Sequence, residues 1–158
     1  MAGNLEFITS ASGTSVSSLS VTDCFSDKYD VYQISSVDGQ LTTGAANYDY
    51  ASLEIRASAS FIERQGTGDT DFRYVVKGYS NPQEGNFVMY IYNPTDTGSY
   101  TFSNWQSAGW SGATNLNGNY KGIGVLKDTQ EVTGLKLIGD ASANLDKAKI
   151  SVYGLASN

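Results

Sequence analysis

The run Phe-Val-Met-Tyr-Ile-Tyr at residues 87–92 contains no charged residue and no residue typical of turns. Aromatic and β-branched side chains fit a pleated, buried surface. Six residues is also an ordinary length for a strand and too short for a typical helix. Segments rich in Asn, Gly, Ser and Pro stand on both sides of the run, at 80–86 and 93–99. We therefore predict a central strand at 87–92 that is covered on both faces.

Outward from this run, apolar residues recur in alternating or continuous stretches, and a helical period of 3.6 residues is almost absent. The clearest alternation is at 51–62, where Leu53, Ile55 and Phe61 share one face and Glu54 and Arg56 share the other. This pattern predicts one long, half-exposed strand. Its polar outer face suits a contact between subunits.

Further strands are predicted at 5–8, 16–21, 29–34, 72–77, 99–105, 122–127, 132–138 and 148–152. Ser12-Gly13 and Asp38-Gly39 are predicted to form turns, because glycine supplies the positive φ that a tight turn needs. Residues 107–120 are rich in small and amide side chains, which predicts a loop.

About eight to ten short strands with a turn signal every ten residues or so predict an all-β fold, either a sandwich or a barrel. The 158 residues contain no internal repeat or linker, so we expect one domain over residues 1–158, with residues 1–4 as a flexible arm. A chain of this length can bury a sizeable core.

The net charge of −6 and the absence of a basic stripe argue against a nucleic-acid partner. No stretch approaches 18 consecutive apolar residues, and the N-terminus lacks the pattern of a secretory signal. We therefore expect no membrane insertion and synthesis in the cytoplasm. The single cysteine, Cys24, excludes an intrachain disulfide and is expected to be buried.

The chain has no histidine, which removes the usual general base and the Ser-His-Asp and Cys-His nucleophile systems. Paired-carboxylate chemistry stays open, although solvated surface carboxylates are the favoured interpretation. We expect no enzyme activity, no cofactor and no metal. The segments considered and set aside are Asp69-Thr70-Asp71 and 115–119 as calcium loops, 122–125 as a nucleotide loop, and Glu54, Glu63, Glu84 and Glu131 as catalytic acids.

Six aromatic residues in or beside the predicted loops are candidates for a ligand or subunit contact. A Tyr or Trp ring can stack on the apolar side of a sugar, and it can equally pack against a neighbouring subunit, which is the favoured alternative. These candidates are Trp105, Trp110, Tyr48, Tyr50, Tyr79 and Tyr120.

The last thirty residues carry a more specific pattern. A strand Val-Thr-Gly-Leu-Lys-Leu at 132–137 is followed by a loop of small residues and a closing Val-Tyr-Gly-Leu at 152–155. Together with Phe-Ser-Asp-Lys-Tyr-Asp-Val-Tyr-Gln-Ile at 25–34 and Leu-Glu-Ile-Arg at 53–56, it resembles a β-sandwich module of bacteriophage tail and other virion structural proteins. The resemblance extends from about residue 20 to 156.

The resemblance implies an antiparallel, jelly-roll-like β-sandwich in a virion protein. It also implies a homo-oligomer, often a trimer, with other virion proteins as partners. It provides no catalytic residues. A tail, baseplate or fibre-associated assembly subunit is the first expectation and a capsid decoration protein the second, and because this chain is almost nothing but the module, the fibre is the less favoured of the tail locations. A carbohydrate-binding module that recognises a host surface glycan is the third.

Overall fold

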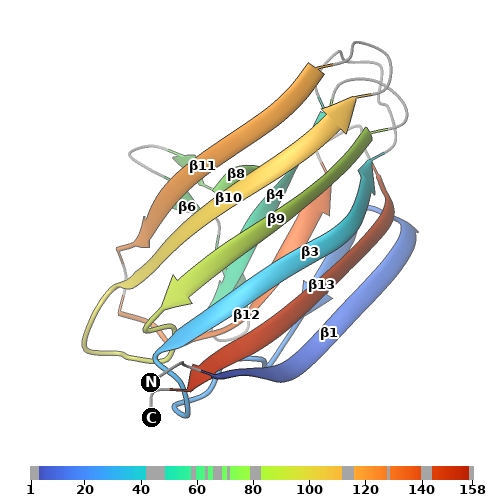
Figure 1. The fold of residues 1–158 in the computed structure, drawn as a ribbon. Helices are drawn as coiled ribbons and strands as arrows, with labels where there is room; N and C mark the ends of the chain where they lie inside the picture. The colour runs from blue at the N-terminus through green and yellow to red at the C-terminus, as the bar shows by residue number, and fades with distance from the viewer. Residues whose placement is uncertain are drawn as a thin grey trace.

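The structure is a computed structural model, and it is all-β, with antiparallel strands packed as a β-sandwich (Figure 1). It describes the backbone of residues 4–41, 49–57, 60–62, 64–65, 69–70, 72–78, 83–111, 116–127, 129–139 and 144–156. Within these ranges, the side chains of 37–84, 110–120 and 139 are not described.

The larger sheet has six strands in the order β1-β13-β3-β9-β10-β11. Its last strand in the sequence, β13, therefore lies between the first strand and the third. The bounds of these strands are Asn4–Val16 for β1, Leu145–Ala156 for β13, Val31–Leu41 for β3, Gln83–Tyr92 for β9, Thr101–Ser111 for β10 and Leu116–Leu126 for β11.

The second sheet has the order β2-β12-β4-β5, and β8 also pairs with β4. Figure 1 shows this sheet behind the six-stranded one. The bounds are Ser18–Val21 for β2, Val132–Gly139 for β12, Asp49–Ala57 for β4, Ser60–Ile62 for β5 and Phe72–Gly78 for β8. A separate two-stranded sheet pairs β6, Arg64–Gln65, with β7, Asp69–Thr70.

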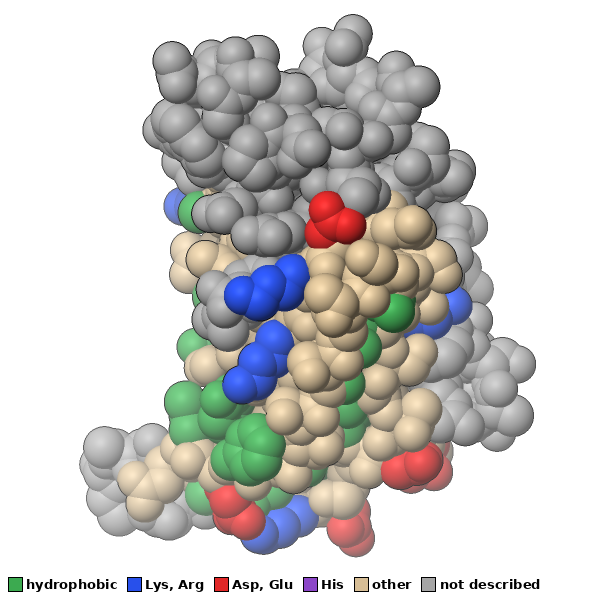
Figure 2. Space-filling model, turned by 90° about the vertical axis from the view of Figure 1, so that its right-hand side faces the viewer, with side chains coloured by type: hydrophobic (Ala, Val, Ile, Leu, Met, Phe, Trp, Pro, Cys, Tyr) green, Lys and Arg blue, Asp and Glu red, His purple; other side chains and the backbone are tan. Residues whose placement is uncertain are grey.

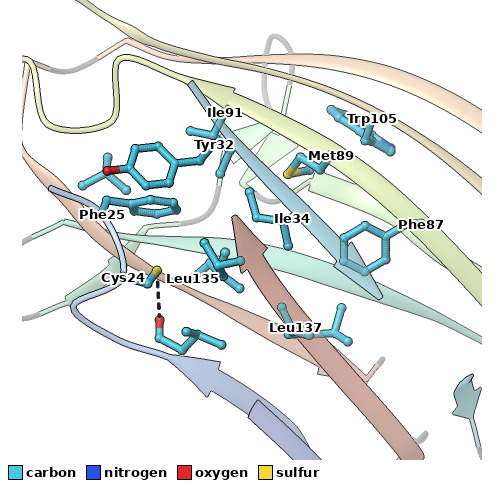
Figure 3. Packing of buried hydrophobic residues seen from close by; sticks show 14 of the residues in the cluster. Cys24, Phe25, Tyr32, Ile34, Phe87, Met89, Ile91, Trp105, Leu135 and Leu137 are labelled. Atoms are coloured by element: carbon cyan, nitrogen blue, oxygen red, sulfur yellow. Dashed lines mark hydrogen bonds between the residues drawn. The ribbon is translucent and has the colours of Figure 1, made fainter. Parts of the chain in front are cut away.

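One hydrophobic cluster fills the space between the two sheets. In Figure 3, Leu135 and Leu137 of β12 face Ile34 and Met89 of the six-stranded sheet. Each of these four side chains is at least 99% buried. Alternate residues of β3, β9 and β13 point into this cluster, as expected for strands with one buried face.

An aromatic cluster closes one end of the core. The Tyr32 ring makes edge-on contacts with Phe25 and Tyr29, at centroid distances of 4.7 and 5.7 Å. Its hydroxyl donates to the Ser26 carbonyl at 2.7 Å and accepts from the Ser26 amide at 2.8 Å. The pattern at 25–34 therefore has a structural role, because it attaches the segment before β3 to the core.

Gly154 in the closing strand lies against the ring of Tyr29. A side-chain carbon at this position would overlap the Tyr29 ring atoms. The Tyr-Gly pair at 153–154 thus places an aromatic side chain on the outer face and a bare backbone on the inner one. This close approach explains why a glycine follows the tyrosine in the closing motif.

The central strand is confirmed, with a difference in its burial. β9 pairs with β3 on one side and β10 on the other. Phe87, Met89 and Ile91 are buried, whereas Val88 and Tyr90 are half-buried. The strand is therefore covered fully on the inner face only, because no layer of described residues packs on the outer one.

Four other local predictions were wrong. Residues 12–13 continue β1 and are paired with β13, and residues 38–39 lie in β3, where the register with β9 shifts between Ser36 and Gly39. The segment 51–62 is two strands, β4 and β5, that pair with each other. The predicted loop at 107–120 is the paired end of β10 and β11. At 12–13, 38–39 and 107–120, cross-strand pairing overrides the local turn preference of Gly, Ser and Asn. At 51–62 the alternation predicted one strand, whereas β5 pairs antiparallel with β4.

The described residues form thirteen strands and not eight to ten. Three of the extra strands, β5, β6 and β7, have only two or three residues. Asn4 begins β1, so the predicted arm does not include it, and residues 1–3 lie outside the described residues.

Replacing Gly154 with Ala should destabilise the fold by about 1–3 kcal/mol, because the added methyl group must displace the buried Tyr29 ring. Urea unfolding followed by circular dichroism would measure the change. Ser10→Ala, in the exposed part of β1, is the matched control and should change the free energy of unfolding by less than about 0.5 kcal/mol. Equal stability of the two variants would contradict the packing described for Gly154.

Candidate functional site

The sequence suggested that Trp105 is an exposed residue in or beside a loop. In the structure it is a core residue in the middle of β10. Its side chain is 5% exposed and belongs to the hydrophobic cluster. It is paired with Gly122 across the β10–β11 ladder, and a side-chain carbon at Gly122 would overlap the indole ring. The Trp105 side chain therefore packs the core of the sandwich.

The other five aromatic candidates are not brought together by the described residues. Trp110 lies in β10 opposite Asn117, Tyr120 lies in β11 opposite Ser107, and Tyr50 lies in β4 opposite Lys77. The side chains of these three are not described. Tyr48 and Tyr79 lie outside the described residues.

A different aromatic surface lies on the outer face of the six-stranded sheet. One row of cross-strand neighbours crosses all six strands, and a second apolar row lies beside it. We call the two rows the apolar band. The first row is Phe7, Tyr153, Gln33, Tyr90, Asn104 and Ile123, and the second contains Leu5, Leu155, Val31, Tyr92, Phe102 and Val125.

The band contains most of the strongly exposed large hydrophobic side chains among the described residues. Ile123 is 79% exposed and Phe7 is 57% exposed, and Leu5 and Phe102 are nearly half exposed. Figure 2, which looks onto the β1 edge, shows hydrophobic side chains gathered toward the lower left. Contiguous exposed apolar surface of this kind marks an interaction site more often than scattered residues do.

Hydrogen bonds hold the band's polar side chains in place. The Tyr90 hydroxyl donates to Gln33 Oε1 at 3.0 Å, and Asn104 Nδ2 donates to the Tyr92 hydroxyl at 2.9 Å. The Phe7 and Tyr153 rings meet edge-on, with centroids 5.7 Å apart. The band is thus largely ordered before any partner binds, which lowers the entropic cost of binding.

Two hollows open on the same outer face. One, of about 270 Å³, lies over β9, β10 and β11, and the other, of about 310 Å³, lies over β1 and β13. The first is lined by Val88, Tyr90, Asn104, Gln106, Lys121 and Ile123, with Trp105 and Gly122 beneath them, and the second by Ser12, Gly13, Thr14, Lys147, Ala148 and Lys149.

The shifted carboxylates have structural partners and lie outside both hollows. Glu6 accepts a hydrogen bond from Lys28 Nζ at 2.7 Å, which lowers the pKa of Glu6 and raises the pKa of Lys28. The pKa of Asp96 is lowered by hydrogen bonds from the Ser99 hydroxyl and the Gly98 amide. A general acid must carry its proton at neutral pH. Neither carboxyl group meets this requirement, because the pKa of each is lowered.

The remaining sequence candidates do not form a reactive group. Among the residues that the structure describes, no three His, Cys, Asp or Glu side chains are placed to hold a metal ion. Glu54 and Glu84 lie in different sheets, and their side chains are not described. Glu131 is exposed just before β12, and Glu63 lies outside the described residues.

Comparison of the chain with protein-family models, curated proteins and solved structures gave no match. The described part of the chain also contains no helix long and apolar enough to cross a membrane. The candidate site therefore rests on the geometry of the outer face alone.

Cys24 should be almost unreactive in the folded protein. Its side chain is 3% exposed, and burial raises the pKa of its thiol to about 12. Because the thiolate is the reactive form, labelling by a disulfide reagent at pH 8 should be about a thousandfold slower than for an exposed thiol of ordinary pKa. Absorbance would follow the labelling. A Ser10→Cys variant supplies the exposed control thiol, and equal rates for Cys24 in native and denatured protein would contradict its burial.

Proposed function

We propose that this chain is a non-enzymatic structural subunit of a bacteriophage particle, associated with the tail or baseplate. The observation that carries the proposal is the apolar band on the outer face of the six-stranded sheet. An assembly subunit needs a rigid frame with an exposed apolar surface that other proteins of the particle cover.

The size of the band favours assembly on a particle over a stable free dimer. Six strands of about 4.8 Å each and two rows of about 7 Å each give a patch of roughly 29 by 14 Å. This area of roughly 400 Å² is below the ~800 Å² that each partner buries in a stable complex. Such a contact is weak alone and becomes effective when several contacts are made on one particle.

We also propose a jelly-roll-like order for the sandwich, and the strand order supports it. β13 lies between β1 and β3, with β9 beyond β3, and β12 lies between β2 and β4, with β8 beyond β4. In a jelly roll, two Greek keys interleave early and late strands of the chain in this way. β10 and β11 extend the first of these sheets beyond β9.

The non-enzymatic part is supported by the chemistry that the chain offers. It contains no histidine, and its one thiol is buried with a raised pKa. The two described carboxylates with shifted pKa values are held by Lys28, Ser99 and Gly98. These features suit binding and packing.

Gold-labelled antibody against this protein should bind intact phage particles at the tail or baseplate. Labelling of the head would replace the tail assignment with capsid decoration. Complete absence from purified particles would reject the proposal.

Replacing Phe102 with Ser should reduce incorporation into particles without unfolding the domain, because this side chain is 45% exposed. Quantitative immunoblotting of purified particles would measure incorporation. Asn86→Ser is the matched control, since it is exposed on the same sheet and lies outside the band. If the two variants were incorporated equally well, the band would not be the assembly surface.

A further inference from the structure

The edge strand β1 leaves half of its backbone groups without a strand partner. It pairs with β13 on one side, and no described strand pairs with its other side (Figure 1). In an antiparallel ladder, alternate residues direct their N–H and C=O groups away from the paired neighbour. None of the other backbone hydrogen bonds among the described residues involves residues 9–14. This segment therefore presents donors and acceptors to a further strand.

Residues 9–14 lack most of the features that protect an edge strand from pairing. Natural edges are often blocked by lysine, by proline or by a short length. The segment Thr-Ser-Ala-Ser-Gly-Thr at 9–14 contains no charged residue and no proline. The single charged residue of β1, Glu6, lies before the segment and is paired with Lys28. At the opposite edge of the sheet, by contrast, β11 lies beside β6 and β8.

Two local irregularities define the regular part of this edge. The register with β13 shifts between Phe7 and Thr9, and Ser15 has a positive φ of 54°. Exposed and half-buried side chains alternate between these two points. The exposed ones are Ser10, Ser12 and Thr14, and the half-buried ones are Thr9, Ala11 and Gly13. A strand that pairs with this edge must match both its length and its alternation of faces.

A second copy of the same segment meets both requirements. In an antiparallel pair with a two-fold axis at Ser12, Ser10 of each copy would lie opposite Thr14 of the other. On the inner face, Ala11 would lie opposite Gly13, so small side chains meet there without overlap. Opposed Ser and Thr hydroxyls can hydrogen-bond across strands, and this register opposes three pairs of them on the outer face. A two-fold axis at Ala11 would match the faces equally well, but it would oppose only two such pairs.

We propose that two copies of this chain pair antiparallel through residues 10–14 of β1, so that their six-stranded sheets join into one continuous sheet. The paired segment contains no charged residue. The charged residues of the two β13 strands would be three strand spacings apart, which is about 14 Å. This distance exceeds the screening length of about 8 Å at physiological ionic strength. The net charge of −6 on each copy therefore opposes the contact only weakly.

The contact is weak in solution and leaves the apolar band open. Five residues of about 3.4 Å each and a sheet about 10 Å thick give roughly 170 Å² for each copy, far below the ~800 Å² of a stable complex. We therefore expect a dissociation constant on the order of 0.1–1 mM. Because the two-fold axis is perpendicular to the sheet, the bands of both copies face the same way, and a dimer offers two contacts to a particle. The inference does not rest on the function proposed above, and its test uses the purified protein, so the two can fail separately.

Analytical ultracentrifugation of the purified protein tests the contact. We expect monomers near about 10 μM and a rising fraction of dimer toward about 1 mM. A Ser12→Lys variant places like charges opposite each other at the two-fold axis and should weaken dimerisation about tenfold. Asn86→Lys is the matched control, because it adds the same charge at an exposed position of β9, away from the edge, and its dimerisation should stay unchanged. Thermal unfolding would verify that each variant is folded.

Cross-linking of single-cysteine variants locates the contact. Cys24 is buried and does not compete with an introduced thiol. With a short bismaleimide at about 1 mM protein, Ser12→Cys should give covalent dimers and Asn86→Cys should give few. Equal dimerisation of the native chain and Ser12→Lys would overturn the proposal, as would cross-linking through Ile123→Cys in the apolar band in place of Ser12→Cys. A native chain that stays monomeric at every concentration, as expected if β1 pairs only with a strand of another protein, would also overturn it.

Discussion

The insertion of the last two strands between earlier ones is the constraint on which the rest of the structure depends. β13 is the partner that joins β1 to β3, and β12 joins β2 to β4, so neither sheet is continuous until residues 132–156 are in place. These contacts span nearly the whole chain and therefore cost much loop-closure entropy before they form. The buried faces of β12 and β13 offset this cost by completing one hydrophobic cluster, and the contact of Gly154 with Tyr29 fixes the closing strand against the segment before β3.

The same constraint determines what the outer face can present. Because β13 is held on both sides, its inner side chains are committed to the core, and Lys147, Lys149 and Tyr153 are placed on the outside beside β1 and β3. Tyr153 then becomes part of the apolar band, and the two lysines line a hollow. Strand pairing, and not proximity in the sequence, thus brings residues of β1, β13, β9, β10 and β11 onto one continuous surface.

The sequence predicted what depends on local alternation and missed what depends on pairing. The strands at 87–92 and 132–138 were predictable because their apolar residues include those of the buried face, and the strand at 72–77 was located correctly as β8. The continuation of β1 through Ser12-Gly13 was not predictable, because these residues favour turns unless a neighbouring strand pairs with them. For the same reason Trp105 was assigned to the surface: its space in the core exists only because Gly122, seventeen positions later in the chain, lies opposite it. The alternation at 147–153 placed the lysines on a polar face, but no local signal pairs them with Ser12 and Thr14.

The net charge of a chain and the charge of one of its faces are different physical quantities. Screening over about 8 Å at physiological ionic strength separates the lysines of the outer face from Asp96 at the loop before β10, but Asp146 directly precedes Lys147 in β13. The net charge of −6 is still a good argument against duplex DNA, because DNA carries one charge per ~1.7 Å and needs a dense basic stripe.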